Sequence, residues 1–232
     1  MAEQKKRPPL EKVRTEDGIA RFPWLNKPDT KFNADGEYST GILLTSAAAQ
    51  PIIDKLTKAA EKALADAKAE LAEKVENEKG EKKAKAKKAL AEIGMQDIPA
   101  RPEYDEDGNE TGNVILTFKM KATRKDKEGN TVKQAPKLFD AGGSPLAASV
   151  QVWGGSEVQV AGSINAYYIP GTNLAGASLR LAAVQVVKLS SGSGGTADSY
   201  GFAKKDGYRT DSIQDTAEES PAAADSDDGD DF

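Results

Sequence analysis

The chain has 232 residues, of which 38% are hydrophobic and 30% are charged, and it contains no cysteine and no histidine. These two absences exclude thiol nucleophiles, disulfide bonds, imidazole bases and the usual zinc ligands. The N-terminal sequence MAEQKKRPPLEK lacks the apolar core of a signal peptide, and no stretch reaches the apolar length that spans a bilayer. We therefore expect no contact with membranes.

The formal net charge of −5 is unevenly distributed along the chain. Residues 210–232 hold nine acidic residues and no lysine or arginine, whereas residues 1–209 hold 32 basic and 28 acidic residues, a net charge of +4. Blocks of like charge stay solvated and often act as interaction tails. The sequence therefore predicts an acidic tail on a weakly basic body, and this tail ends in DSDDGDDF with a single aromatic residue, Phe232.

The N-terminal third of the chain predicts an arm, a strand and a long helix. Residues 1–20 are polar and include two adjacent prolines, so we expect a disordered arm. An irregular segment with aromatic and basic residues follows and becomes a strand at about 37–45. Apolar residues then recur every three or four positions within 51–93, which predicts an amphipathic helix with a break at Gly80. Pro51 is expected as its first residue.

From about Val114 the periodicity changes from helical to alternating. KDKEGN predicts a hairpin turn, SSGSGGTADS predicts a flexible linker, and residues 199–232 predict disorder. If no bulge intervenes, the even positions fill a core. These are Val114, Leu116, Phe118, Met120, Leu138, Val150, Val152, Val158, Val160, Ile164 and Tyr168.

About five main strands and one helical insertion predict a fold that is mainly β with α. The arrangement expected is a five-stranded OB-fold barrel with the helical insertion at 51–93, between a disordered N-terminal arm and a disordered C-terminal tail. The expected parts are the arm at 1–20, the barrel domain at 21–190, and the linker and acidic tail at 191–232. The strand count alone leaves a β-sandwich open.

The odd positions of the predicted strands place lysines beside aromatic rings on the solvent side. Lysines follow a phosphate backbone and rings stack on unpaired bases, so the pattern favours single-stranded nucleic acid. Two alternatives stay open: Phe139, Trp153 and Tyr167 are aromatic residues at strand edges that the helix or the arm covers, and Trp24 anchors its segment to the barrel. The candidate DNA-binding residues are Trp24, Lys27, Lys31, Lys119, Lys121, Lys133, Lys137, Phe139, Trp153 and Tyr167.

Other motifs fail on spacing. DEDGNE has its glycine in the fourth position and a leucine, Leu116, in the twelfth, so it predicts a turn rather than a calcium loop. AGGSPL and SGSGG lack the lysine and the strand–helix context of a phosphate loop. No set of acids predicts catalysis, and we expect no cofactor, no metal and no enzymatic activity.

Several segments resemble, in this order, the single-stranded DNA-binding proteins of the phage T7 type. They are KPD with GEYSTGILLT, the basic strand FKMKATRKDK, the pair SEVQV and GASLRLAAVQVVKL, and the end DGDDF. The resemblance is spread over most of the chain, which departs from the family in the Ala/Lys/Glu-rich segment around 58–91. It implies an OB fold that coats single-stranded DNA during phage replication and recombination, in the cytoplasm of the infected bacterial host.

The resemblance also implies roles for particular residues. In that family the acidic tail contacts the DNA polymerase and other replication proteins, and the terminal aromatic residue matters for this contact. On this chain the tail role falls on Asp225, Asp227, Asp228, Asp230, Asp231 and Phe232, and the cleft includes Trp24, Lys27, Lys119, Lys121 and Tyr167 or Tyr168. A homodimer is left open.

The leading hypothesis is thus a single-stranded DNA-binding protein whose tail competes with DNA for the basic groove. An alternative is a scaffolding protein that acts through the helix at 51–93, whose Lys/Glu face otherwise predicts a solvated surface. A carboxylate–metal nuclease is a third hypothesis.

Overall fold

The computed structural model describes residues 10–31, 33–190, 201, 203 and 205, and every structural statement below concerns these residues. The chain divides into two units, 1–193 and 194–232, and we describe the first. The predicted tail residues, from Asp225 to Phe232, lie outside the described residues. In the described part of the chain, no helix combines the length and apolar character that crossing a membrane requires.

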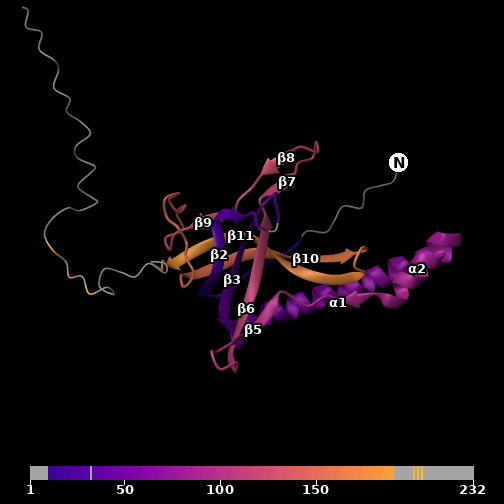
Figure 1. Cartoon of the computed structure of the whole chain (residues 1–232), viewed down its shortest axis with the longest axis horizontal. Coiled ribbons are helices and arrows are strands. Elements are labelled where there is room, and N and C mark those ends of the chain that lie inside the picture. Colours follow the sequence, from indigo (N-terminus) through magenta and orange to yellow (C-terminus); the bar gives the residue numbers. More distant parts are fainter. Residues whose placement is uncertain (1–9, 32, 191–200, 202, 204, 206–232) are drawn as a thin grey trace, which may run out of the picture. The chain divides into compact units, whose positions relative to one another are not determined.

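Five long strands form a closed barrel (Figure 1). They are β2 (Gly18–Asp29), β3 (Glu37–Thr45), β6 (Glu110–Lys121), β10 (Glu157–Ile169) and β11 (Leu174–Lys188). The hydrogen-bonded order is β2-β3-β6-β11-β10, and β10 pairs with β2 to complete the ring. All neighbours are antiparallel except β6 and β11, which are parallel. The predicted OB-fold barrel is confirmed, and β3 has the predicted bounds.

Short strands extend this barrel at its edges. β1 (Glu11–Arg14) pairs with β10, β5 (Ala100–Tyr104) pairs with β6, and β4 (Gly94–Met95) and β9 (Lys137–Phe139) pair with β11. β7 (Thr123–Lys125) and β8 (Thr131–Lys133) form a separate hairpin, which closes at the predicted KDKEGN turn. The prediction of a disordered arm is wrong for residues 11–14 and 18–20, because both segments pair with strands of the barrel and bury Val13 and Ala20 in its core.

The segment expected to be irregular is strand β2, so that expectation is wrong as well. Its pairing with β3 is interrupted between Arg21 and Trp24, where Phe22 has a positive φ of 48°. Proline at position 23 has no N–H to donate, which a bulge tolerates better than a regular ladder. The interruption hides the strand from periodicity analysis.

The helical insertion consists of α1 (Ser46–Asn77) and α2 (Gly80–Glu92). The predicted break at Gly80 is confirmed. The predicted start at Pro51 is wrong, since α1 begins five residues earlier, at Ser46. The side chain of Thr45 accepts a hydrogen bond from the backbone N of Ala48 at 3.3 Å, which satisfies one of the free N–H groups at the helix start.

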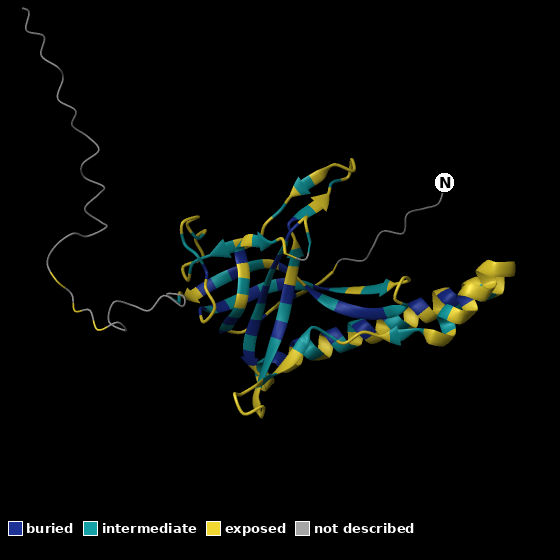
Figure 2. Ribbon diagram, in the orientation of Figure 1, coloured by how far each residue is buried: buried dark blue, intermediate teal, exposed yellow. Residues whose placement is uncertain are grey.

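Helix α1 covers the part of β10 and β11 that extends beyond the barrel (Figures 1 and 2). Burial of this apolar face contributes about 1.5–3 kcal/mol for each large aliphatic side chain. Helix α2 packs against α1 through Ala86, whereas its lysines are exposed. The apolar face of α1 is therefore already occupied by the barrel. The buried residues of α1 are Ala49, Ile52, Leu56, Ala60, Ala63, Ala67 and Leu71.

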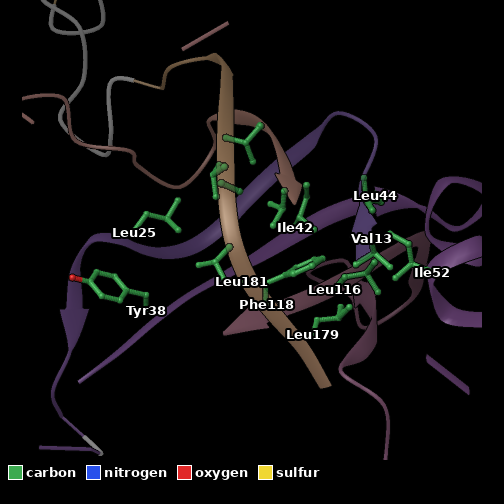
Figure 3. Close-up of a cluster of buried hydrophobic side chains, with 14 of the residues drawn as sticks. Val13, Leu25, Tyr38, Ile42, Leu44, Ile52, Leu116, Phe118, Leu179 and Leu181 are labelled. Atoms are coloured by element: carbon green, nitrogen blue, oxygen red, sulfur yellow. The ribbon is translucent and has the colours of Figure 1, made fainter. Parts of the chain in front are cut away.

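The barrel interior is filled as the alternation predicts (Figure 3). Buried even positions are Leu116, Phe118, Val152, Val158, Val160 and Ile164, and the half-buried Val114, Met120 and Leu138 pack against them. Val150 and Tyr168 are only half-buried and lie outside this cluster. Val150 precedes β10 in a loop, and the hydroxyl of Tyr168 donates to Asn173 Oδ1 at 2.8 Å.

Three tight turns share one aspartate motif. In the DEDGNE turn, Asp105 Oδ1 accepts from the backbone N of Asp107 and Asn109 at 3.0 and 2.8 Å, which confirms the predicted turn. The same arrangement recurs at Asp126, and in part at Asp140. The fourth residue of each turn is a glycine with φ between 83° and 90°, a region that other residues rarely adopt. Hydrogen bonds from Asn109 lower the pKa of Asp105. At Asp126 desolvation opposes the same effect, but the hydrogen bonds from Asn130 and its neighbours still lower the pKa.

We predict that Gly162→Ala destabilises the barrel by about 1–3 kcal/mol. A Cβ atom at this position would collide with the carbonyl oxygen of Arg180 and lie 3.0 Å from the Phe118 ring. Urea denaturation measures the loss. Gly171→Ala is the matched control, because nothing lies within 4 Å of its Cβ position. Equal stability of the two variants would contradict the close approach of β10 to β11 and β6.

Candidate nucleic-acid interface

A groove of about 1120 Å³ lies on the outside of the barrel. Its lining comes from β6, β10 and β11, from residues 97–101 around the start of β5, and from the base of the β7–β8 hairpin, with Leu10 and with Glu37 of β3 in addition. Five lining residues are basic and two are acidic, so the groove attracts anions. The bases are Arg101, Lys119, Lys121, Arg124 and Arg180, and the acids are Glu37 and Asp97.

One row of paired residues crosses this outer surface, and we call it the belt. Directly paired residues share a face of the sheet, so successive pairings place their side chains next to one another. Five strand spacings give the belt a length of roughly 24 Å. Trp24 lies at one end of the belt, and two basic residues, Lys119 and Arg180, lie in its middle. In order, the belt is Trp24, Ser39, Lys119, Arg180, Ser163 and Lys12.

The two central bases of the belt differ in their partners. Lys119 Nζ pairs with Glu37 Oε1 at 2.9 Å, and both side chains are partly exposed. Arg180 is exposed and makes no ion pair within the described residues. Exposed pairs such as Lys119–Glu37 contribute at most about 1 kcal/mol, so an incoming phosphate can compete with Glu37. Arg180 is ready to bind one directly.

A second ion pair ties β5 to β2 beside the groove. Arg21 Nη2 lies 2.6 Å from Glu103 Oε1, and Glu103 Oε2 accepts hydrogen bonds from Asn113 at 3.0 Å and Thr111 at 2.8 Å. These donors favour the ionised carboxylate, and the contacts with Asn113 and Thr111, followed by Arg21, lower the pKa of Glu103 below its usual value. The network fixes the strand that continues from the groove-lining residues 97–101.

Three exposed aromatic side chains belong to segments that lie side by side. Asn26 Oδ1 accepts from the backbone N of Val152 at 3.0 Å, and the N–H of Gly155 donates to Ala20 at 2.9 Å, so the loop at 152–155 follows β2. Phe22 is 86% exposed, and Trp24 and Trp153 are each about half exposed. A water-exposed ring on a positive-φ backbone is unusual for a packing residue. Sequence reasoning missed Phe22, although the RFPW run was visible.

The predicted site residues divide between several places. Lys119 and Lys121 line the groove, and Tyr167 lies two pairs beyond the lining residues Asn165 and Ser178, over Gly176. Lys27 is exposed on β2, and Lys31 follows β2 with its backbone N bonded to Asp29 at 2.8 Å. Lys133 lies on β8, Lys137 and Phe139 lie on β9, and Trp153 lies in its loop. The described structure thus brings together only some of the predicted set.

The sequence analysis also missed several bases. Arg180 stands at an even position, but the register of β11 shifts between its pairings with Ala161 and Gly162, so the odd positions before that shift face inward. The sequence did carry a signal, because Arg180 stands between two leucines, and a charged residue between two apolar ones indicates a strand with its charge on the solvent side. In the structure Leu179 and Leu181 are buried and Arg180 is exposed. Lys12 and Arg14 were assigned to the arm and not considered.

The β7–β8 hairpin and its flanks are the most basic part of the barrel's surface. Residues 121–137 hold six bases and two acids, a net charge of +4. This equals the net charge of the whole segment 1–209. Residues 79–92, which include α2, also hold six bases and two acids. Within residues 10–31 and 33–190, no group of three or more acids is arranged to hold a metal ion.

Comparisons with known proteins agree with this architecture. A family model described as single-stranded DNA-binding protein of bacteriophage T7 matches residues 17–189. The crystal structure of gp2.5, a single-stranded DNA-binding protein encoded by bacteriophage T7, is 22% identical with a TM-score of 0.62, covering 78% of this chain and 93% of that one.

A C-terminally truncated single-stranded DNA-binding protein from bacteriophage Enc34 is 11% identical with a TM-score of 0.50, covering 77% of this chain and 86% of that one. At these identities the two structures support the fold. No curated protein sequence matches the chain.

We predict that Glu103→Gln lowers stability at neutral pH by about 1 kcal/mol. Because the folded pKa of Glu103 lies below its usual value, its stabilising effect is present above the unfolded pKa and is lost as the pH falls through the folded pKa. Urea denaturation at neutral and acidic pH measures the difference between variant and wild type. The stability difference between Glu103→Gln and the wild type should become smaller as the pH is lowered. The exposed Glu106→Gln is the control, and a pH-independent loss in Glu103→Gln would contradict the charge-based explanation.

Proposed function

The chain belongs to the single-stranded DNA-binding protein family of bacteriophage T7, and from this premise we propose that it coats single-stranded DNA during phage replication and recombination. The observation that carries the proposal is the belt, which joins an exposed tryptophan to two adjacent bases at the edge of a basic groove. An extended strand that follows the belt meets a stacking ring and phosphate-binding groups in succession.

The proposed binding mode combines two interactions. Arg180, Lys119 and Lys121 neutralise phosphates, and neutralisation releases counterions from the DNA. Phe22, Trp24 and Trp153 offer faces on which bases stack, each contributing roughly 1–3 kcal/mol. Duplex DNA hides its base faces, so the combination selects single strands without reading sequence.

The acidic tail completes the proposal. Its nine negative charges are tethered to a basic surface, so their effective concentration there is high and they compete with DNA phosphates. DNA then displaces the tail, which recruits the phage DNA polymerase and other replication proteins through Asp225–Asp231 and Phe232. The protein acts without catalysis, in the cytoplasm of the infected host.

Arg180→Ala should weaken the affinity for oligo-dT and reduce the slope of log affinity against log salt by about 0.7, since one phosphate contact is lost. Lys119→Ala should have a smaller effect, because the variant loses a base that is shared with Glu37. Fluorescence anisotropy over a series of salt concentrations measures both quantities.

The matched control for these substitutions is Lys62→Ala, which removes an exposed base from α1. It should leave affinity and slope unchanged. An Arg180→Ala protein with the wild-type slope, or a Lys62→Ala protein with the larger loss, would exclude the belt as the phosphate path.

Deletion of residues 211–232 should tighten DNA binding at low salt, with the gain fading as salt screens the tethered charges. The same deletion should abolish capture of the phage DNA polymerase. Phe232→Ala should weaken polymerase capture while leaving DNA affinity unchanged. Unchanged DNA affinity in the deletion at low salt would rule out competition by the tail.

A further inference from the structure

A second, smaller hollow of about 310 Å³ lies on the outside of β1, β9, β10 and β11. Its size is at the lower end of the range for small-ligand sites. Ala161 and Ala183 are paired directly across β10 and β11, and Gln159 is paired with Gln185 in the same way. Phe139 is paired with Gln185, and Arg14 with Ala161, so an aromatic ring and a base flank the two alanines. No acidic residue lines the hollow.

The polar groups in this hollow have unused hydrogen-bonding capacity. Gln185 Nε2 donates to the carbonyl oxygens of Asp140 and Ala141 at 3.2 and 3.1 Å, which fixes the amide and leaves its Oε1 as an open acceptor. Within the described residues, Gln159 makes no side-chain hydrogen bond and Arg14 makes no ion pair. The hollow therefore offers the aromatic ring of Phe139 and the free acceptor Oε1 of Gln185. It also offers the side-chain amide of Gln159, with its donors and acceptor unused, and the positive charge of Arg14.

We propose that this hollow accepts one unpaired nucleobase of the bound strand, and the proposal rests on the single-stranded DNA binding proposed above. The alanines leave room for a planar ring beside Phe139. Gln185 Oε1 accepts from an N–H on the Watson–Crick edge, such as N3–H of thymine, while Gln159 donates to a base oxygen. Arg14 binds the adjoining phosphate.

The location of the hollow indicates that its ligand is a nucleobase of the DNA strand that follows the belt, rather than an unrelated molecule. The Ala161–Ala183 pair is adjacent to the belt pair Ser163–Arg180, separated only by the register shift at Gly162. Two residues along a strand span about 7 Å, so the hollow continues the belt. Lys137, which is paired with Ala183, adds another positively charged side chain on the far side of the hollow. The proposal thus gives Phe139, a predicted DNA-binding residue, its role in this nucleobase site rather than in the belt.

Two substitutions test the site without removing a charge. Ala183→Leu fills the hollow, and Phe139→Leu removes the aromatic face while keeping an apolar side chain. Each should weaken binding of fluorescein-labelled oligo-dT about tenfold without changing the salt slope, because a stacking contact and not a phosphate contact is lost. Ala182→Leu is the matched control, since Ala182 is exposed and does not line the hollow. Thermal unfolding verifies that all three variants remain folded.

Photocrosslinking identifies the contact directly. Oligo-dT carrying 5-iodouracil should crosslink to Phe139 in the wild type and lose that crosslink in Ala183→Leu. Wild-type affinity in both variants, with crosslinks confined to Phe22, Trp24 or Trp153, would overturn the base site while leaving the proposed function intact. Absence of any oligo-dT binding by the wild type would instead overturn the proposed function.

Discussion

One short contact determines both the core and the candidate site: the parallel pairing of β6 with β11. Only two residue pairs make it, Phe118 with Leu179 and Lys119 with Arg180. The first pair faces inward and is almost completely buried, and the second faces outward and is exposed. Because adjacent strand residues point to opposite faces, the pairing that closes the barrel also brings together the two basic residues that we propose bind phosphate. A slip by one residue would bury two charges.

The helical insertion explains how β10 and β11 extend beyond the barrel without exposing an apolar face. Helix α1 buries its alanine and leucine face against them, and Asn173 Nδ2 donates to the carbonyl of Ala89 in α2 at 2.8 Å. Asn173 also accepts from Tyr168, so the end of the hairpin is tied to the insertion. Asn165 and Ser178, on the same two strands, line the groove. The insertion therefore supports the groove through packing, which gives its apolar face a structural role.

Local patterns predicted the elements better than the site. Strand 37–45, the helix break at Gly80 and the inward-facing Leu116 and Phe118 follow from periodicity and turn chemistry, which the sequence carries locally. The site depends on which residues pair across strands. Two irregularities, at Phe22 in β2 and near Ala182 in β11, change the alternation, so Phe22 and Arg180 were missed. Register is set by long-range packing, and a single chain's pattern does not contain it. The tail predictions concern residues outside the described structure and stay predictions.

Quantitative lysine footprinting of the full chain with and without oligo-dT tests the central claim most directly. It measures the acetylation rate of each lysine by mass spectrometry, and both candidate surfaces, the groove and α2, carry exposed lysines. If the strand follows the belt, Lys119 and Lys121 lose reactivity on binding while Lys82 and Lys87 keep theirs. Protection of Lys82 and Lys87 with unchanged Lys119 and Lys121 would contradict the account and assign DNA binding to the helical insertion.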